Sequence, residues 1–268
     1  MRIGAHDLDD RVFIVAEAGN NHEGGFARAE EMIERAAQSG ADAIKFQTIV
    51  PEKLVSSRET ARLAQLARFR FSYQQFEALA RRAAHVGIAF LSTPFDVDSV
   101  AFLSPLVPAY KVASGDNDCF GLLEAIAATG KPILLSTGML DLSGVARAKS
   151  VIETAWRARG AAGSLALMHC VVAYPTPAEH ANLGAIRELA TLGVTVGYSD
   201  HTLGNDSAVL SVALGARVIE KHFTLDKNLS EFRDHKLSDD PAEFADLVRR
   251  VRGAEAMLGT GAKRVMPV

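Results

Sequence analysis

The stretch Val196-Gly-Tyr-Ser-Asp-His-Thr202, followed further along by Ile219-Glu-Lys-His-Phe-Thr224, decides the fold of this chain. In each stretch a histidine, His201 or His222, closes a short apolar run that has the character of a β-strand. Residues 205–215 between them are rich in Ala, Leu, Val and Ser and are long enough for one crossover helix. The pattern predicts a β-α-β unit with a histidine at the end of each parallel strand.

Two imidazoles at neighbouring strand ends can share one metal ion. Parallel strands lie about 4.8 Å apart, so His201 and His222 can be two ligands of a single ion whose other positions stay open for water or substrate. An open site of this kind is typical of a catalytic metal. The alternative is that both histidines are ordinary polar residues at strand ends, but their equivalent positions favour the metal site.

Composition limits the class of protein. With 268 residues, of which 48% are hydrophobic and 23% charged, the chain can bury one large core and has the usual length of an α/β barrel, about 250 residues. A net charge of −3 indicates no general attraction to nucleic acid or to an anionic membrane. Residues 1–7 lack the apolar core of a signal peptide, so we expect a cytoplasmic protein. Cys119 and Cys170 are expected to be reduced thiols, and we assign them no role.

Apolar runs alternate with amphipathic stretches along the whole chain. Eight runs have strand character: residues 12–16, 43–47, 88–92, 109–112, 133–136, 165–169, 194–198 and 217–220. Amphipathic stretches between them include residues 27–39, 73–85, 120–129, 143–159 and 183–192. Eight βα units favour an α/β fold closed into a (β/α)₈ TIM barrel over an open doubly wound sheet. The dinucleotide fingerprint G-x-G-x-x-G is also missing after the first strand.

The remaining segments predict additions to a single barrel domain, residues 1–268. Residues 1–11 are expected to form a short amino-terminal cap. Residues 51–70 form an insertion after the second strand, which we expect to fold over the active face. Residues 241–258 predict a final helix that covers the barrel.

In such a barrel the active site lies at the carboxyl ends of the strands. Polar residues follow all eight predicted strands: Glu17, Lys45, Gln47, Ser92, Thr93, Lys111, Ser114, Ser136, Thr137, His169, Tyr174, Ser199, Asp200, His201, Glu220 and His222. Lysines, hydroxyls and the backbone amides of Gly115 and Gly138 suit a phosphate or a carboxylate, and a histidine-bound metal suits a carbonyl oxygen. The alternative is that Lys45 and Lys111 are structural and pair with Asp or Glu inside the barrel.

Eight motifs, in order along the chain, indicate a known family. They are FIVAEAGNNHEG at 13–24, AIKFQT at 43–48, STPF at 92–95, YKVASG at 110–115, KPILLSTGM at 131–139, YPTP at 174–177, YSDHT at 198–202 and EKHFT at 220–224. Over residues 13–267 the chain resembles the sialic acid synthase (N-acetylneuraminate synthase) family. The resemblance implies a (β/α)₈ barrel that condenses phosphoenolpyruvate with an aldose, N-acetylmannosamine or a related amino sugar. The expected products are a 2-keto-3-deoxy sugar acid of the nonulosonate type and inorganic phosphate.

The resemblance also implies roles for individual residues. The implied catalytic residues are Glu17, Lys45, Lys111, His201 and His222, of which His201 and His222 hold a divalent ion, Mn²⁺ or alternatively Mg²⁺ or Co²⁺. Phosphoenolpyruvate is expected at Lys45, Lys111, Ser114, Ser136 and Ser199, and the sugar at Gln47, Asp116, Tyr174 and Asp234. Glu17 lies near the reacting carbons, where it either transfers protons or holds a substrate hydroxyl. The expected partners are the two substrates and a second copy of the chain in a homodimer, with no nucleic acid and no membrane.

Two features differ from the family pattern. Family members usually carry a small antifreeze-like domain after a segment like residues 257–267, and its arginine reaches the sugar site of a partner subunit. This sequence ends at Val268, so we expect sugar recognition to differ, or the sequence to have been trimmed. Some relatives have a polar residue at the position of Val172 that helps to hold the donor, and an apolar side chain removes that contact.

Two other functions remain as alternatives. An octulosonate-phosphate-type synthase, with a phosphorylated acceptor, needs an additional basic cluster, for which Arg58, Arg62, Arg68 and Arg70 are the candidates. A non-catalytic barrel that binds a sugar or a protein partner would show damage to the metal pair or to the lysines, and this sequence has all of them.

Overall fold

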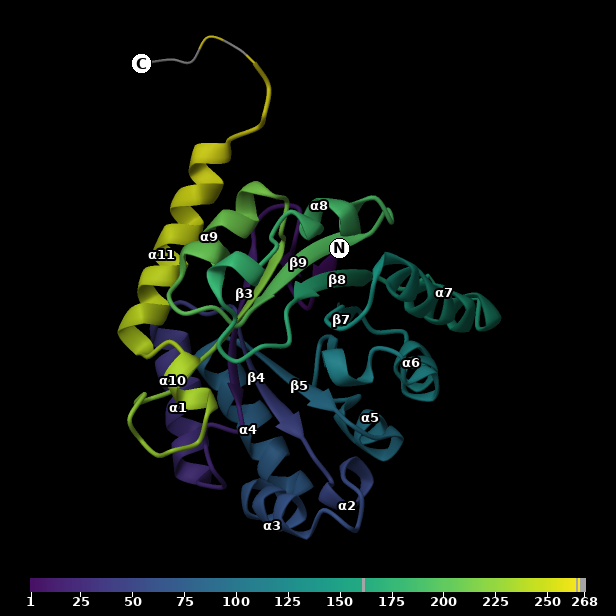
Figure 1. Ribbon diagram of the computed structural model, residues 1–268, viewed down its shortest axis with the longest axis vertical. Coiled ribbons are helices and arrows are strands. Elements are labelled where there is room, and N and C mark those ends of the chain that lie inside the picture. The colour runs from purple at the N-terminus through teal and green to yellow at the C-terminus, as the bar shows by residue number, and fades with distance from the viewer. Residues whose placement is uncertain (161, 264, 266–268) are drawn as a thin grey trace.

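Eight parallel strands alternate with helices in the computed structural model, which describes residues 1–160, 162–263 and 265 (Figure 1). The strands are β3 (Phe13–Gly19), β4 (Ala43–Thr48), β5 (Ala89–Pro94), β6 (Tyr110–Val112), β7 (Ile133–Ser136), β8 (Leu165–Cys170), β9 (Thr195–Asp200) and β10 (Val218–His222). They pair in the order β5-β4-β3-β10-β9-β8-β7-β6, and β5 lies against β6 to complete the ring. The predicted (β/α)₈ barrel is confirmed, and each predicted strand overlaps an observed one.

Helices pack around the outside of this ring (Figure 1). They are α1 (Phe26–Gln38), α4 (Tyr73–Val86), α5 (Val97–Leu103), α6 (Phe120–Ala127), α7 (Leu142–Ala158), α8 (Ala185–Ala190), α9 (Asp206–Ala213) and α11 (Pro241–Leu258). Local sequence sets several of their ends: Ser72 and Asp240 complete capping boxes at the starts of α4 and α11, and Gly87 ends α4 in the left-handed conformation. None of the helices in the described ranges has the length and hydropathy of a membrane span.

Three short additions complete the chain. β1 (Arg2–Ile3) and β2 (His6–Asp7) form an antiparallel ribbon, from which Ile3 and Leu8 pack into the interior of the barrel. The segment between β4 and α4 contains α2 (Pro51–Leu54) and α3 (Thr60–Phe69). A loop after β10 leads to α10 (Asp234–Leu237).

The two-residue period of the strands separates an outer core from an inner one. Outward side chains such as Ile14, Phe46 and Tyr198 pack against the helices. Inward apolar side chains plug the lower half of the barrel: Ile3, Leu8, Phe13, Val15, Ala43, Leu91, Ala109, Leu134, Ala166, Met168 and Val218. Toward the carboxyl ends, the same inward positions are polar and line one cavity: Glu17, Lys45, Gln47, Lys111, Ser136, Ser199, Glu220 and His222. Strand periodicity therefore places a polar site on top of an apolar plug.

Some polar residues occupy the alternate strand positions, whose side chains point outward, and belong to the outer layer. Asp200 and Lys221 form an ion pair of 2.9 Å in which both side chains are fully buried. Lys221 Nζ also donates to the carbonyl oxygens of Thr202 and Gly204 at 2.6 and 2.7 Å, so all three of its hydrogens have acceptors. Complete pairing is what makes a buried charge pair tolerable. The prediction that all polar strand-end residues share the active face is therefore wrong for four of them: Ser92, Thr137, His169 and Asp200.

Asp239, just before α11, is buried, and one of its carboxylate oxygens has no hydrogen-bond partner in the part of the chain that the structure describes; burial raises its pKa to about 7. The unfolded chain releases this proton near pH 4. Because the folded state binds the proton more tightly, Asp239 lowers the free energy of unfolding progressively as the pH rises from about 4 to about 7. We expect Asp239→Asn to raise Tm at pH 8 relative to the wild type, by about 2–4 °C for each kcal/mol recovered, and by less at pH 5. Thermal unfolding at both pH values checks this, and an equal effect at both would contradict it.

Candidate active site

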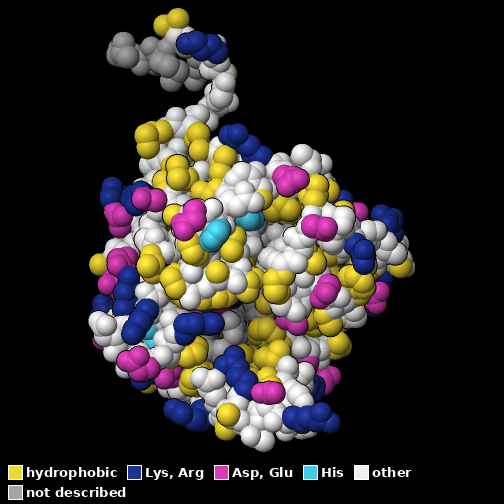
Figure 2. Space-filling model, viewed as in Figure 1, with side chains coloured by type: hydrophobic (Ala, Val, Ile, Leu, Met, Phe, Trp, Pro, Cys, Tyr) yellow, Lys and Arg dark blue, Asp and Glu magenta, His cyan; other side chains and the backbone are white. Residues whose placement is uncertain are grey.

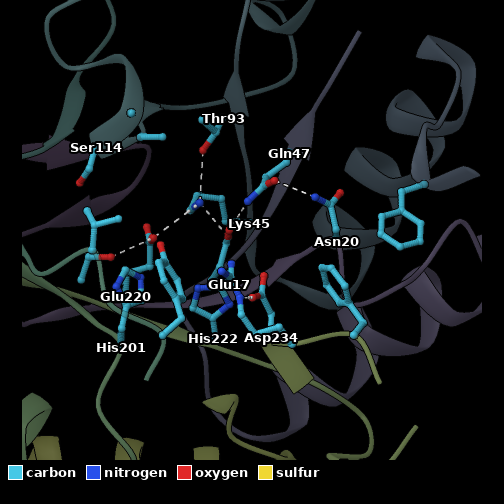
Figure 3. Close-up of a pocket in the computed structure, with 18 of the residues that line it drawn as sticks. Glu17, Asn20, Lys45, Gln47, Thr93, Ser114, His201, Glu220, His222 and Asp234 are labelled. Carbon is cyan, nitrogen blue, oxygen red and sulfur yellow. Dashed lines mark hydrogen bonds and ion pairs between the residues drawn. The ribbon is translucent and has the colours of Figure 1, made fainter. Parts of the chain in front are cut away.

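The carboxyl ends of the strands open into a cavity of about 830 Å³ (Figure 3). Eleven of the twelve predicted site residues line it: Glu17, Lys45, Gln47, Lys111, Ser114, Ser136, Tyr174, Ser199, His201, His222 and Asp234. The twelfth, Asp116, lies in the 3₁₀ turn η1 (Ser114–Asp116) after β6 and is not among the lining residues. The structure therefore does not bring Asp116 to the cavity.

Four buried charged side chains form a network at the floor of the cavity. Lys45 Nζ lies 2.7 Å from Glu17 Oε2 and 3.6 Å from Glu220 Oε1. Lys111 Nζ lies 3.7 Å from the same Glu220 oxygen. Two positive and two negative charges thus balance, which offsets part of the cost of burying them. Both lysines are paired with carboxylates, as the structural alternative expects, and both also face the cavity.

Hydroxyl groups hold these charges in place. Lys111 Nζ donates to Ser136 Oγ at 2.6 Å, and Lys45 Nζ donates to Thr93 Oγ1 at 3.2 Å. Such hydroxyls can turn to accept from an ammonium group or to donate to an anion. The network is therefore able to exchange one of its internal contacts for a bound anion.

The two carboxyl groups of the network differ in their affinity for protons. Burial raises the pKa of Glu17 to about 7, against the opposing effect of Lys45. Burial also acts to raise the pKa of Glu220, but Lys111 and Lys45 outweigh it and the pKa is lowered. A carboxyl with a pKa near 7 can give and take a proton at neutral pH, so Glu17 is suited to proton transfer while Glu220 stays ionised.

A chain of amides orients the Glu17 carboxyl (Figure 3). Gln47 Nε2 donates to Glu17 Oε1 at 3.3 Å, and Asn20 Nδ2 donates to Gln47 Oε1 at 2.8 Å. β3 has a bulge between Glu17 and Gly19, and bulges beside active sites commonly re-aim side chains. Asn20 was missed as a site residue. Glu220 was placed among the polar residues at the strand ends but was given no role of its own.

His201 and His222 lie side by side at the strand ends, with ring centroids 5.4 Å apart. His201 Nδ1 lies 2.8 Å from the carbonyl oxygen of Val171, so this nitrogen carries a proton, and in the neutral ring Nε2 keeps a free lone pair. His222 Nδ1 is buried and has no hydrogen-bond partner among the described residues. Burial lowers the pKa of His222 well below its usual range, which keeps the ring neutral.

This pair fits a divalent metal ion. A neutral imidazole with an unsatisfied nitrogen beside a second imidazole with a fixed tautomer is what metal ligation requires. Among the described residues, no group of three or more His, Cys, Asp and Glu has the arrangement of a metal site. Two imidazoles would therefore supply the protein ligands, and water or substrate would supply the others.

Tyr174 connects the histidine pair to the mouth of the cavity. Its ring lies 4.2 Å from that of His201, centroid to centroid. The guanidinium carbon of Arg233 lies 4.5 Å from the Tyr174 ring centroid, and Arg233 Nε donates to Asp234 Oδ1 at 3.1 Å. Arg233 was not predicted, because its place over the cavity depends on the path of the loop after β10.

The rest of the mouth comes from α3, from the loop after β10 and from two apolar side chains. α3 contributes Arg62, Gln65, Arg68 and Phe69, and the loop contributes Ser230, Glu231 and Phe232. Of the four arginines proposed for an acceptor, Arg58 and Arg70 are not among the lining residues. Met139 and Val172 line the cavity with 69% and 42% of their surface exposed, so this part of the wall is apolar and open.

Proteins of several organisms are similar to this chain. A model described as the NeuB family matches residues 32–263. An uncharacterized protein of Methanocaldococcus jannaschii is 46% identical over 257 residues, which cover 95% of this chain and 74% of that protein. The N,N'-diacetyllegionaminic acid synthase of Campylobacter jejuni is 37% identical over 269 residues, covering 95% of this chain and 79% of its own. A crystal structure of sialic acid synthetase from Leptospira borgpetersenii, in complex with citrate, matches with a TM-score of 0.93 and 34% identity, over 99% of this chain and 92% of that one.

Proposed function

Because this chain belongs to the NeuB family, we propose that it condenses phosphoenolpyruvate with the aldehyde form of an amino sugar, giving a 2-keto-3-deoxy sugar acid and inorganic phosphate. Similar proteins are named for the synthesis of legionaminic and sialic acids. The observation that carries the proposal is that two buried lysines and a pair of histidines suited to a metal line one cavity. The two lysines suit an anionic donor, and a metal held by the two histidines suits an aldehyde acceptor.

The donor is proposed to bind over Lys45 and Lys111. Their hydroxyl partners, with Ser114 and Ser199 nearby, add donors for phosphate or carboxylate oxygens. The backbone N–H of Gly138 donates to Ser114 Oγ at 3.1 Å, and a Cβ at Gly138 would lie 2.7 Å from that oxygen. Glycine is therefore required where the backbone closes on this part of the cavity. Val172, which lines the same cavity, can offer the donor only apolar contact.

His201 and His222 are proposed to hold a divalent ion that, when bound, polarises the acceptor carbonyl as a Lewis acid. Imidazole ligation favours Mn²⁺ or Co²⁺ over Mg²⁺, which prefers carboxylates and water. His201 keeps its free nitrogen available through its bond to Val171, and Tyr174 packs against its ring. These contacts orient the ligand before any ion binds.

Proton transfer is assigned to Glu17. C3 of phosphoenolpyruvate attacks the aldehyde carbon to form the new C–C bond, and protonated Glu17 gives its proton to the aldehyde oxygen. Water then adds to the electron-poor former C2 and returns a proton to Glu17. The bond between this carbon and the phosphate oxygen then breaks. The proton of the added hydroxyl group leaves with inorganic phosphate, and the ketone forms. The pKa of about 7 lets Glu17 serve in both directions, and Gln47 keeps its carboxyl aimed at the reacting carbons.

The purified protein is expected to release inorganic phosphate from phosphoenolpyruvate only when an aldose and a divalent ion are both present. Acceptors to compare are N-acetylmannosamine, N-acetylglucosamine and their 6-phosphates, with mass spectrometry of the keto-acid product. Release that does not depend on the aldose would indicate a simple phosphatase. Absence of any release across the panel would favour the non-catalytic barrel.

A further inference from the structure

The charged side chains that line the cavity are unevenly paired. Each carboxylate has a nitrogen partner within 4.0 Å: Glu17 and Glu220 have the lysines, Glu231 has Lys236, Asp234 has Arg233, and Glu23 has the ring of His235. In these same pairs, the two lysines and Arg233 each have a carboxylate partner. Within the described part of the chain, Arg62 and Arg68 are the lining cations with no carboxylate within 4.0 Å. The cavity thus has two guanidinium groups that no carboxylate of the described residues pairs with.

Both charges come from one face of α3. Arg62, Gln65 and Arg68 are spaced by three residues, so they follow one side of the helix. α3 has no acidic residue, and Gln65 Oε1 already accepts a hydrogen bond from Arg62. The helix therefore presents hydrogen-bond donors to the cavity.

Two contacts hold the end of α3 over the mouth. Phe69 meets Phe232 edge to face, with ring centroids 5.3 Å apart. Gly24 approaches the helix so closely that a Cβ would lie 2.1 Å from the carbonyl oxygen of Arg68, and its φ of +80° also requires glycine. The backbone that carries the arginines is thus placed without a ligand, which reduces the entropy lost on binding one.

The arginines lie at the mouth, whereas the reactive groups lie at the floor. Lys111 and His222 are buried, and Arg62 and Arg68 are exposed. Figure 2 shows Lys and Arg side chains at the edges of a hollow in this face, above the region that α3 occupies in Figure 1. A sugar that reaches from the histidine pair to the mouth would bring its far end toward the α3 side chains that line the same cavity.

We propose that the acceptor is a phosphorylated amino sugar whose phosphate, at the end opposite the aldehyde, binds to Arg62 and Arg68. The guanidinium group matches phosphate geometry with paired hydrogen bonds, and a mouth position leaves the remaining phosphate oxygens in water. The donor's own anionic groups have Lys45 and Lys111, so the arginines serve a second anion. This inference rests on the proposed function and specifies its acceptor.

The test compares N-acetylmannosamine 6-phosphate with N-acetylmannosamine as acceptor. For the wild type, we expect kcat/KM to be at least about tenfold higher with the phosphorylated sugar. Charged hydrogen bonds contribute about 1.5–3 kcal/mol, and about 1.4 kcal/mol corresponds to a factor of ten. The double variant Arg62→Gln/Arg68→Gln should lose on the order of 10- to 100-fold with the phosphorylated sugar. Its loss with the neutral sugar should be much smaller, so the preference for the phosphorylated sugar, given by the ratio of the two kcat/KM values, should largely disappear.

Arg58→Gln/Arg70→Gln is the matched control, because it removes the same charge from the same segment outside the cavity. It should behave as the wild type with both sugars. Equal use of the two sugars by the wild type, or unchanged discrimination in the Arg62/Arg68 variant, would overturn the proposal.

Failure of the proposed function would look different, since neither sugar would then consume phosphoenolpyruvate. Calorimetric binding of N-acetylmannosamine 6-phosphate and of N-acetylmannosamine still tests the arginine site in that case. Binding that needs the phosphate, is lost in Arg62→Gln/Arg68→Gln and is kept in the control supports the site. The same affinity for both sugars, or no binding of the phosphorylated one, refutes it. Thermal unfolding of each variant verifies that it is folded.

Discussion

Removal of divalent metal by a chelator is expected to abolish phosphate release from phosphoenolpyruvate, and Mn²⁺ is expected to restore it. The reason is that the aldehyde carbonyl needs an electrophilic partner, and the cavity offers His201 and His222 as ligands for a cation. His201→Ala or His222→Ala should lower Mn²⁺ affinity on the order of tenfold or more. Calorimetry or the electron paramagnetic resonance of Mn²⁺ measures this affinity without reference to activity.

His180→Ala is the control for the histidine variants, because His180 is exposed in η2 (Ala178–His180) and is not among the cavity-lining residues. It should bind Mn²⁺ as the wild type does. Thermal unfolding should show that all three variants are folded. Full activity in excess chelator, or wild-type Mn²⁺ affinity in both site variants, would remove the metal from this mechanism.

Lys111→Met is expected to weaken use of the donor and to destabilise the fold. Loss of a charge-assisted contact should cost about 1.5–3 kcal/mol of transition-state stabilisation, which is seen as a lower kcat/KM for phosphoenolpyruvate. Glu220 would also lose one of its two lysine partners while remaining buried, which costs up to about 3–5 kcal/mol of stability. Steady-state kinetics and urea unfolding measure the two effects separately.

The double variant Lys111→Met/Glu220→Gln separates the two roles. It removes both charges of the pair, so the stability lost in Lys111→Met should largely return. Donor kcat/KM should stay low, because nothing replaces the cation that binds the donor. The pair Lys45→Met and Lys45→Met/Glu17→Gln allows the same stability comparison at the other end of the network. If both lysine variants show unchanged donor kinetics, the lysines are structural.

Sequence by itself determined the barrel and most of its site. Regular alternation between strands and helices, with capping residues such as Ser72 and Asp240, is a local signal, and eight such units favour closure into a barrel. Parallel strands end at the same side of the sheet, so residues just after them must meet there. For this reason His201, His222 and both lysines could be assigned to one cavity from their spacing alone.

Tertiary structure decided which charged side chains pair in the cavity and which segments form its mouth. Asp200 and Ser92 looked like site residues but face the helices, because one residue along a strand reverses the side chain. The partners of Lys45 and Lys111 depend on the register of neighbouring strands, which sequence spacing does not state. Asn20 and Arg233 and the arginines of α3 reach the site on connecting segments. The paths of those segments depend on contacts between distant parts of the chain, such as Gly24 with Arg68, and no local pattern of residues encodes such contacts.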